Sequence, residues 1–393
     1  MCTGKSKGAL ALNVEEHFSP EEKLLFESKL YQFEKCIETE DIIPTDMLGF
    51  LTFMNKDLPD KYQDYIARVT KEIIGQIDGA YPAELKLLKY LAVFKCFNQT
   101  GNISVSHAQM VLGYGISNNP KIDFLQYTCE YFKMIVRTET EFEQGHGHYS
   151  VLEISHLPVA EAILNHFLDK ESLLDVMLEI LNNKPLVKHR FLQSKFINDL
   201  SEMATKRRWS PVGPDSEKEK DMIRKKESFS PLILRLKDDR KQDAITLLKE
   251  FIISIEQVSN LPVAKYIANL NQTLSRLHLD YKDFEEAKVF AKKAISLNEY
   301  SSAYHDTVGQ IFKWEIATYL VVTSEVESNK ILELAVEAVN SFRKAQDLAK
   351  LNKSPVLQVE ADSEEINDDD TFPVRCSGYK GEIQTIHTGI NIN

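Results

Sequence analysis

The sequence has little glycine and proline, few cysteines and no long apolar run. Its 393 residues include 15 Gly and 13 Pro, and this scarcity of turn residues favours helices over a strand-rich fold. The five cysteines are scattered without a Cys-x-x-Cys pair, which argues against a zinc site or a disulfide framework and fits a reducing compartment. No run approaches the roughly 18–20 apolar residues of a membrane-spanning helix, so we expect no membrane insertion.

The acidic balance of the chain restricts its partners. A net charge of −12 repels phosphate backbones, so nucleic-acid binding would need a local basic cluster. The candidate cluster consists of Lys188, Arg190, Lys206, Arg207 and Arg208. We keep two interpretations of it, a solvated helix-and-linker surface and an RNA-binding surface.

Residue sets that would indicate catalysis do not stand out. Gly4, Lys5 and Ser6 resemble the end of a phosphate-binding loop, but the earlier glycine and the preceding buried strand are missing. His146 and His148 are too few ligands for a closed metal site. We therefore expect a non-enzymatic chain with no metal and no cofactor of its own.

The middle of the chain is patterned as a winged helix, three helices followed by a β-hairpin. The expected helices are Glu84–Phe97, Ser106–Leu112 and Asp123–Met134, and the expected strands are Ile135–Phe142 and Tyr149–Ile154. The third helix has no arginine to read DNA bases, so we expect this domain to brace neighbouring domains instead.

A repeat follows further along the chain. Ser275 lies 34 residues before Gly309, which is the period of tetratricopeptide helix pairs. Small residues are needed where the two helices of a pair cross closely. The positions expected to pack in this way are Ser275, Ala287, Ala294, Gly309, Ala338, Phe342 and Ala345. The partner helix of the second repeat comes 17 residues late, at Ala338 rather than 321, so Val321–Asn329 is expected to be an inserted loop.

These patterns predict five segments. They are a helical region at 1–78, with helices at 19–34, 45–55 and 61–77, a winged-helix-like domain at 79–170, a helical connector with a charged linker at 171–228, tetratricopeptide-like repeats at 229–352, and an acidic, partly disordered tail at 353–393. The tail is expected to be disordered because like charges and low hydrophobicity oppose a packed core.

Several short blocks along the chain match one known family in the same order. The blocks are Gly49–Met54, Ile103–His107, Val136–Glu139, Ser194–Phe196, Asp306–Lys313 and Tyr379–Ile383. They make the chain similar to the sterile alpha motif domain-containing protein nine and nine-like family. The resemblance implies part of a large cytoplasmic, interferon-linked protein that restricts viruses, represses translation and growth, and is tied to endosomes.

The resemblance runs from the helical lid of the family's P-loop NTPase to its repeats. It implies a mainly α fold: a helical lid plus a winged helix with a small β-hairpin, followed by a tetratricopeptide-like α-solenoid. Nothing in the chain resembles the sterile alpha motif, the nuclease-like domain or the phosphate loop, so ATP or ADP would act only through an NTPase domain outside this sequence. The expected function is regulatory, through protein partners bound by the repeats and the winged helix, with an RNA-binding module as the alternative.

One residue receives a role from the resemblance. In such NTPases a histidine after the winged-helix hairpin senses the phosphate of the bound nucleotide, and His156 occupies that place. Leu157 stands where the family pattern has an acidic residue. The alternative is that His156 caps the helix that begins near Pro158.

Overall fold

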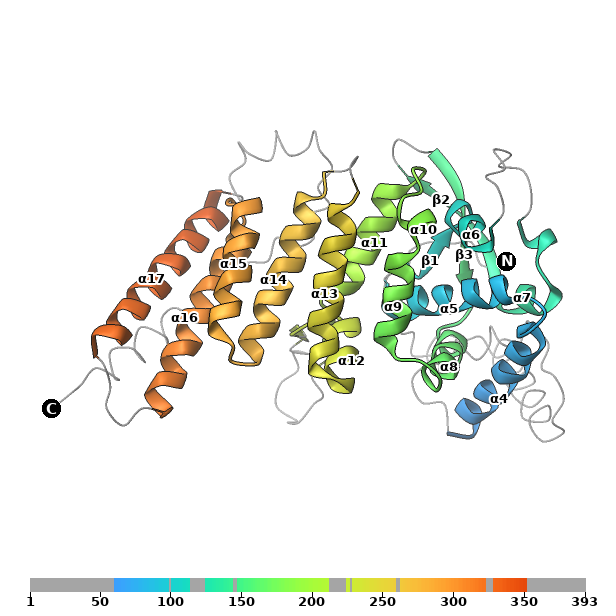
Figure 1. Cartoon of the computed structure of the whole chain (residues 1–393), viewed down its shortest axis with the longest axis horizontal. Coiled ribbons are helices and arrows are strands. Elements are labelled where there is room, and N and C mark those ends of the chain that lie inside the picture. Colours follow the sequence, from blue (N-terminus) through green and yellow to red (C-terminus); the bar gives the residue numbers. More distant parts are fainter. Residues whose placement is uncertain are drawn as a thin grey trace, which may run out of the picture. The chain divides into compact units, whose positions relative to one another are not determined.

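A computed structural model of the chain describes residues 60–98, 100–113, 124–143, 147–211, 224–226, 228–258, 262–322 and 328–351. These residues are mostly helical (Figure 1), with one antiparallel sheet of three strands and one of two short strands, so the mainly α prediction is confirmed. They divide into two compact units, Met1–Met203 and Ala204–Asn393. The helices predicted at 19–34 and 45–55 and the acidic tail lie outside the described residues.

Two helices begin the first unit, α4 (Asp60–Ile77) and α5 (Pro82–Phe97). α4 ends where Gly79 adopts a φ of 80°, a left-handed conformation that glycine takes without steric cost. Pro82 opens α5, where its missing N–H is not needed by the helix. The apolar run of α5 is buried from Leu87 to Phe94, so this helix forms the core of the unit.

The sheet of the first unit has the order β1-β3-β2, and all its pairs are antiparallel. Its strands are β1 (Asn102–Ser104), β2 (Val136–Glu143) and β3 (Gly147–Ile154). Between β1 and β2 the chain forms α6 (Val105–Leu112), the 3-10 helix η1 (Phe124–Tyr127) and α7 (Glu130–Ile135). The central strand β3 is buried from Val151 to Ile154, whereas β2 exposes alternate residues at the edge.

One predicted helix of this region is interrupted. The sequence predicted a continuous helix at Asp123–Met134, but η1 and α7 are separated at Thr128 and Cys129. The Cys129 backbone is extended, and its N–H donates to the carboxylate of Glu84 in α5 at 3.2 Å. This tertiary contact replaces the helical hydrogen bond, which is why local periodicity did not reveal the break.

Four further helices complete the description of this part of the chain. They are α8 (Leu157–Leu168), α9 (Leu173–Asn182), α10 (Lys184–Val187) and α11 (Gln193–Thr205). α9 begins with a reciprocal capping box, in which Ser172 and Asp175 each accept a backbone N–H of the other.

The second unit consists of a small two-stranded sheet and helices that pack against their neighbours in sequence (Figure 1). The elements are β4 (Trp209–Pro211), β5 (Arg224–Lys226), α12 (Pro231–Asp239), α13 (Lys241–Glu256), α14 (Ala264–Asp280), α15 (Phe284–Leu297), α16 (Ser302–Val322) and α17 (Ser328–Leu351). The strands lie where a charged linker was predicted. Strands of three residues carry no period that sequence reading could detect.

The loop predicted at Val321–Asn329 overlaps only the last residues of α16, which ends at Val322, and the first residues of α17, which begins at Ser328; its middle, 323–327, lies outside the described residues. The two helices contain 21 and 24 residues, against 17 and 14 in α14 and α15. Extending an existing helix costs little, because only nucleation is unfavourable.

Candidate functional site

Small side chains lie at the crossings of the second unit's helices. Ser275, Ala287 and Ala294 are completely buried, and Ala338 and Ala345 are nearly so. The Ser275 hydroxyl of α14 donates a hydrogen bond of 2.8 Å to the Ala287 carbonyl of α15. Gly309 of α16 faces the ring of Phe342 on α17. The residues singled out by the 34-residue spacing thus fix how adjacent helices approach one another.

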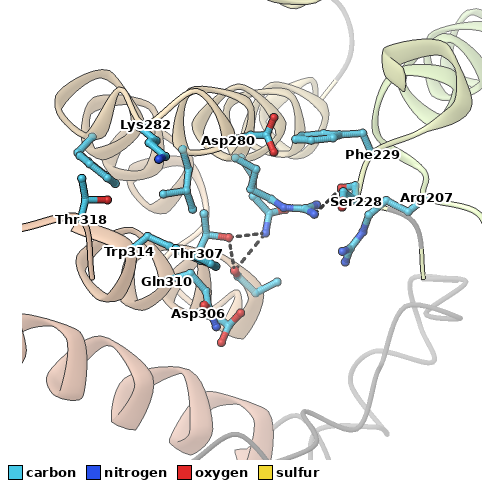
Figure 2. A pocket seen from close by; sticks show the side chains of 15 residues that line it. Arg207, Ser228, Phe229, Asp280, Lys282, Asp306, Thr307, Gln310, Trp314 and Thr318 are labelled. Atoms are coloured by element: carbon cyan, nitrogen blue, oxygen red, sulfur yellow. Dashed lines mark hydrogen bonds between the residues drawn. The ribbon is translucent and has the colours of Figure 1, made fainter. Parts of the chain in front are cut away.

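The face of this helical stack that is built by α14 and α16 contains a pocket of about 520 Å³ (Figure 2). α16 contributes Thr307, Gln310, Trp314 and Thr318. These residues are three or four positions apart and therefore share one face of the helix. We call the surface formed by the lining residues of α14 and α16 and by Arg207, Ser228 and Phe229 the groove.

Hydrogen bonds fix the floor of the groove. The side-chain amide of Gln272 on α14 donates to the Thr307 hydroxyl and to the Ala303 carbonyl on α16, each at 3.1 Å (Figure 2). The Thr307 hydroxyl also donates to the Ala303 carbonyl at 2.9 Å. The two helices are therefore held in register by residues that line the groove, so this part of the site is organised before any ligand binds.

One wall of the groove is cationic. Arg276 donates to the Ser228 carbonyl at 2.5 Å, and its guanidinium lies 5.4 Å from the centre of the Phe229 ring. Burial, together with the charge of Arg207, lowers the pKa of Arg276 to about 10, and the charge of Asp306 opposes this shift. Arg276 still carries its charge at neutral pH. An anionic group of a ligand would relieve the repulsion between the two arginines.

The groove also presents an aromatic anchor. Trp314 is 55% exposed, although it lines a hollow whose other apolar walls include Leu279 and Phe284. A half-exposed indole beside fixed polar groups is typical of residues that dominate protein interfaces. Sequence reading missed Trp314, Arg276 and Gln272, because their positions are meaningful only once α14 and α16 are known to be neighbours.

Comparisons with known proteins indicate the same family as the short sequence blocks. The mouse (Mus musculus) protein named sterile alpha motif domain-containing protein 9-like is 24% identical over 358 residues, or 87% of this chain and 19% of the relative. Human (Homo sapiens) sterile alpha motif domain-containing protein 9 is 24% identical over 393 residues, or 95% and 22%. The chain resembles the sterile alpha motif domain-containing protein 9 family.

The predicted resemblance is thereby confirmed over most of the chain. Human sterile alpha motif domain-containing protein 9-like is 25% identical over 366 residues, covering 88% of this chain and 20% of the relative. The chain spans about a fifth of the length of these curated relatives. No family model and no solved structure gives a significant match.

His156, to which the family resemblance gave a role, is the N-cap residue of α8, but its side chain makes no capping hydrogen bond. Burial lowers the pKa of His156 to about 4, and the charges of Arg137 and Lys95 act in the same direction. Both cations pair with the buried Glu153, at 2.6 Å and 3.1 Å. The imidazole is therefore neutral at physiological pH, and the nucleotide-sensing role remains a prediction.

The basic residues of the RNA-binding hypothesis are divided between the two units. Lys188 and Arg190 are exposed residues of the first unit, on either side of the buried His189. Lys206, Arg207 and Arg208 belong to the second unit, and Arg207 lines the groove.

Two further absences concern only the described part of the chain. No helix there is long and apolar enough to cross a membrane. No group of three or more His, Cys, Asp or Glu residues is placed to hold a metal ion. His148 is exposed in β3, and His146 lies outside the described residues.

Proposed function

We propose that the second unit is a protein-interaction module whose groove binds an extended segment of a partner protein. The observation that carries this proposal is the half-exposed Trp314 beside the fixed Gln272–Thr307 pair in a hollow of about 520 Å³. A ligand side chain that covers the indole would gain apolar burial without ordering the site. The 34-residue spacing supports the same function, because stacked helix pairs form extended binding surfaces.

The first unit, in this proposal, is a winged helix that braces neighbouring domains. The succession α5, β1, α6, α7, β2, β3 and the sheet order β1-β3-β2 support the winged-helix interpretation. In α7 the only basic side chain, Lys133, pairs with Glu130 at 2.7 Å. A recognition helix without a cation directed at DNA argues for protein contacts instead.

For the whole protein we propose a regulatory role in innate immunity. This non-enzymatic portion would belong to a cytoplasmic, endosome-associated protein that restrains viruses and cell growth. Any ATP or ADP would be bound by an NTPase domain outside this sequence. Support comes from similarity to the curated relatives along 87–95% of the chain.

The groove hypothesis is tested by a pair of matched double variants in the full chain. Trp314→Ala with Gln310→Ala removes the exposed anchor and a neighbouring polar group of the groove. Leu332→Ala with Val336→Ala removes exposed apolar side chains of α17 that do not line it. Quantitative co-purification from cells should show loss of the bound proteins with the groove variant only. Equal partner sets for both variants would refute the proposal.

RNA binding by the cluster of Lys188, Arg190, Lys206, Arg207 and Arg208 is the alternative. It predicts an affinity that falls steeply with salt and decreases when Lys206, Arg207 and Arg208 are neutralised. Titration of labelled single-stranded RNA at two salt concentrations decides between the two functions, and absence of binding removes the alternative.

A further inference from the structure

The groove is rich in cations although the chain as a whole is acidic. Arg207, Arg276 and Lys282 line it together with two acids, Asp280 and Asp306. Asp280 is already paired with Lys237 at 2.5 Å. Three cations therefore line the groove against two carboxylates, one of which is paired from outside the lining, in a chain whose net charge is −12. Charge complementarity therefore favours an anionic occupant.

The chain contains a segment of suitable composition. Between Glu360 and Asp370 there is no lysine or arginine. The acids of this stretch are Glu360, Asp362, Glu364, Glu365, Asp368, Asp369 and Asp370. Val356, Leu357 and Val359 precede it directly, and such apolar side chains match the exposed indole of Trp314.

The direction of α17 brings its C-terminal end to the part of α16 that contributes to the groove. Lys330 near the start of α17 lies 6.0 Å from the ring of Tyr319 near the end of α16, and Phe342 further along faces Gly309. The two helices are therefore antiparallel, and Leu351 at the end of α17 is level with the start of α16, where Asp306 lines the groove. Glu360 follows Leu351 by nine residues, which span about 30 Å when extended.

We propose that the acidic segment Glu360–Asp370 occupies the groove of its own chain and competes there with partner segments. A short tether gives such a segment an effective concentration on the order of 1 mM. Even a Kd on the order of 0.1 mM would then fill about nine-tenths of the grooves. Partner binding would require displacement of this segment, so the proposal rests on the proposed function of the groove.

In a chain with a single tryptophan, the fluorescence of Trp314 reports directly on whether the groove is occupied. The sequence has two tryptophans, so Trp209→Phe leaves Trp314 as the only indole. In this background the seven acids of the segment are changed to Asn or Gln. Acrylamide, a neutral quencher, should quench Trp314 more strongly in the amide variant than in the parent chain. A peptide with the sequence of residues 356–370, added at millimolar concentration, should restore protection.

Two matched controls separate occupancy from general charge effects. Glu333→Gln with Glu337→Gln neutralises exposed acids of α17 and should leave Trp314 quenching unchanged. Lys282→Glu changes an exposed lysine of the groove and should increase quenching, whereas Lys292→Glu, an exposed lysine outside it, should not. Salt at about 1 M shortens the screening length to about 3 Å and should make the parent resemble the amide variant.

Unchanged quenching in the amide variant would overturn the inference, even if the peptide binds in trans. The co-purification experiment distinguishes this failure from failure of the proposed function. If the groove variant loses partners that bind equally well to the amide variant and to the parent chain, the proposed function stands and the internal occupant is refuted. If the acidic segment protects Trp314 but no partner depends on the groove, the internal occupant stands and the proposed function is refuted.

Discussion

The ring of Phe342 occupies the place that a side chain at position 309 would take. A Cβ on Gly309 would lie 2.6 Å from Cε1 of Phe342 and 2.7 Å from its Cδ1. Real Cβ atoms essentially never make such short contacts. The close crossing of α16 and α17 therefore depends on the absence of a side chain at this position.

Gly309→Ala should destabilise the second unit by about 1–3 kcal/mol, because the new methyl group forces Phe342 out of its place. Urea denaturation of the full chain, followed by hydrogen exchange in α16 and α17, measures this effect. Gly75→Ala in α4 is the control, since a Cβ there meets nothing within 4 Å. It should be neutral or stabilise by up to about 1 kcal/mol, as expected for Gly→Ala inside a helix. Equal behaviour of the two variants would contradict the account.

Ser275 should tolerate alanine but not leucine. Ser275→Ala removes one hydrogen bond to the Ala287 carbonyl and should cost about 0.5–1.5 kcal/mol. Ser275→Leu overfills the crossing of α14 and α15 and should cost about 1–3 kcal/mol or more. Ser296 is the control, because its hydroxyl also donates to a backbone carbonyl, that of Lys293, but is exposed. Ser296→Leu should have little effect on the urea midpoint.

The sequence predicted those features that depend on local spacing. The 34-residue period identified Ser275 and Gly309, because helix pairs that cross closely require small residues at fixed steps. Contacts between distant segments were not predictable in this way. The Glu84 carboxylate accepts the Cys129 N–H and so interrupts the helix at Asp123–Met134, which periodicity predicted to be continuous.

The groove could not be predicted from the sequence for a related reason. Gln272 and Thr307 are 35 positions apart, and their hydrogen bond follows only from the side-by-side packing of α14 and α16.

Acid should destabilise the first unit through His107. This ring is buried against Phe196 at 4.5 Å and edge-on to His189 at 4.9 Å, between ring centres. Burial lowers its pKa from 6.5 to about 3, with the charges of His189 and Lys195 adding to the effect. The folded pKa lies below the unfolded one, so stability is complete above pH 6.5 and is lost as the pH falls towards 3. At pH 5 the loss should be about 2 kcal/mol.

Free energies of unfolding measured between pH 7 and pH 5 test this prediction. His107→Gln cannot take up the proton and should flatten the pH dependence of hydrogen exchange in α6. His148→Gln, at an exposed position of β3, should leave it unchanged. A slope that is the same in both variants would exclude His107 as its source.

The proposed binding of an extended peptide segment in the groove between α14 and α16 can be detected by photocrosslinking. A photoreactive phenylalanine analogue is placed either at Gln310 in the groove or at Leu332 on α17. We expect adducts from position 310, to Glu360–Asp370 of the same chain or to a segment of a bound partner, and none from position 332. Adducts formed equally from both positions, or from position 332 alone, would contradict the proposed binding.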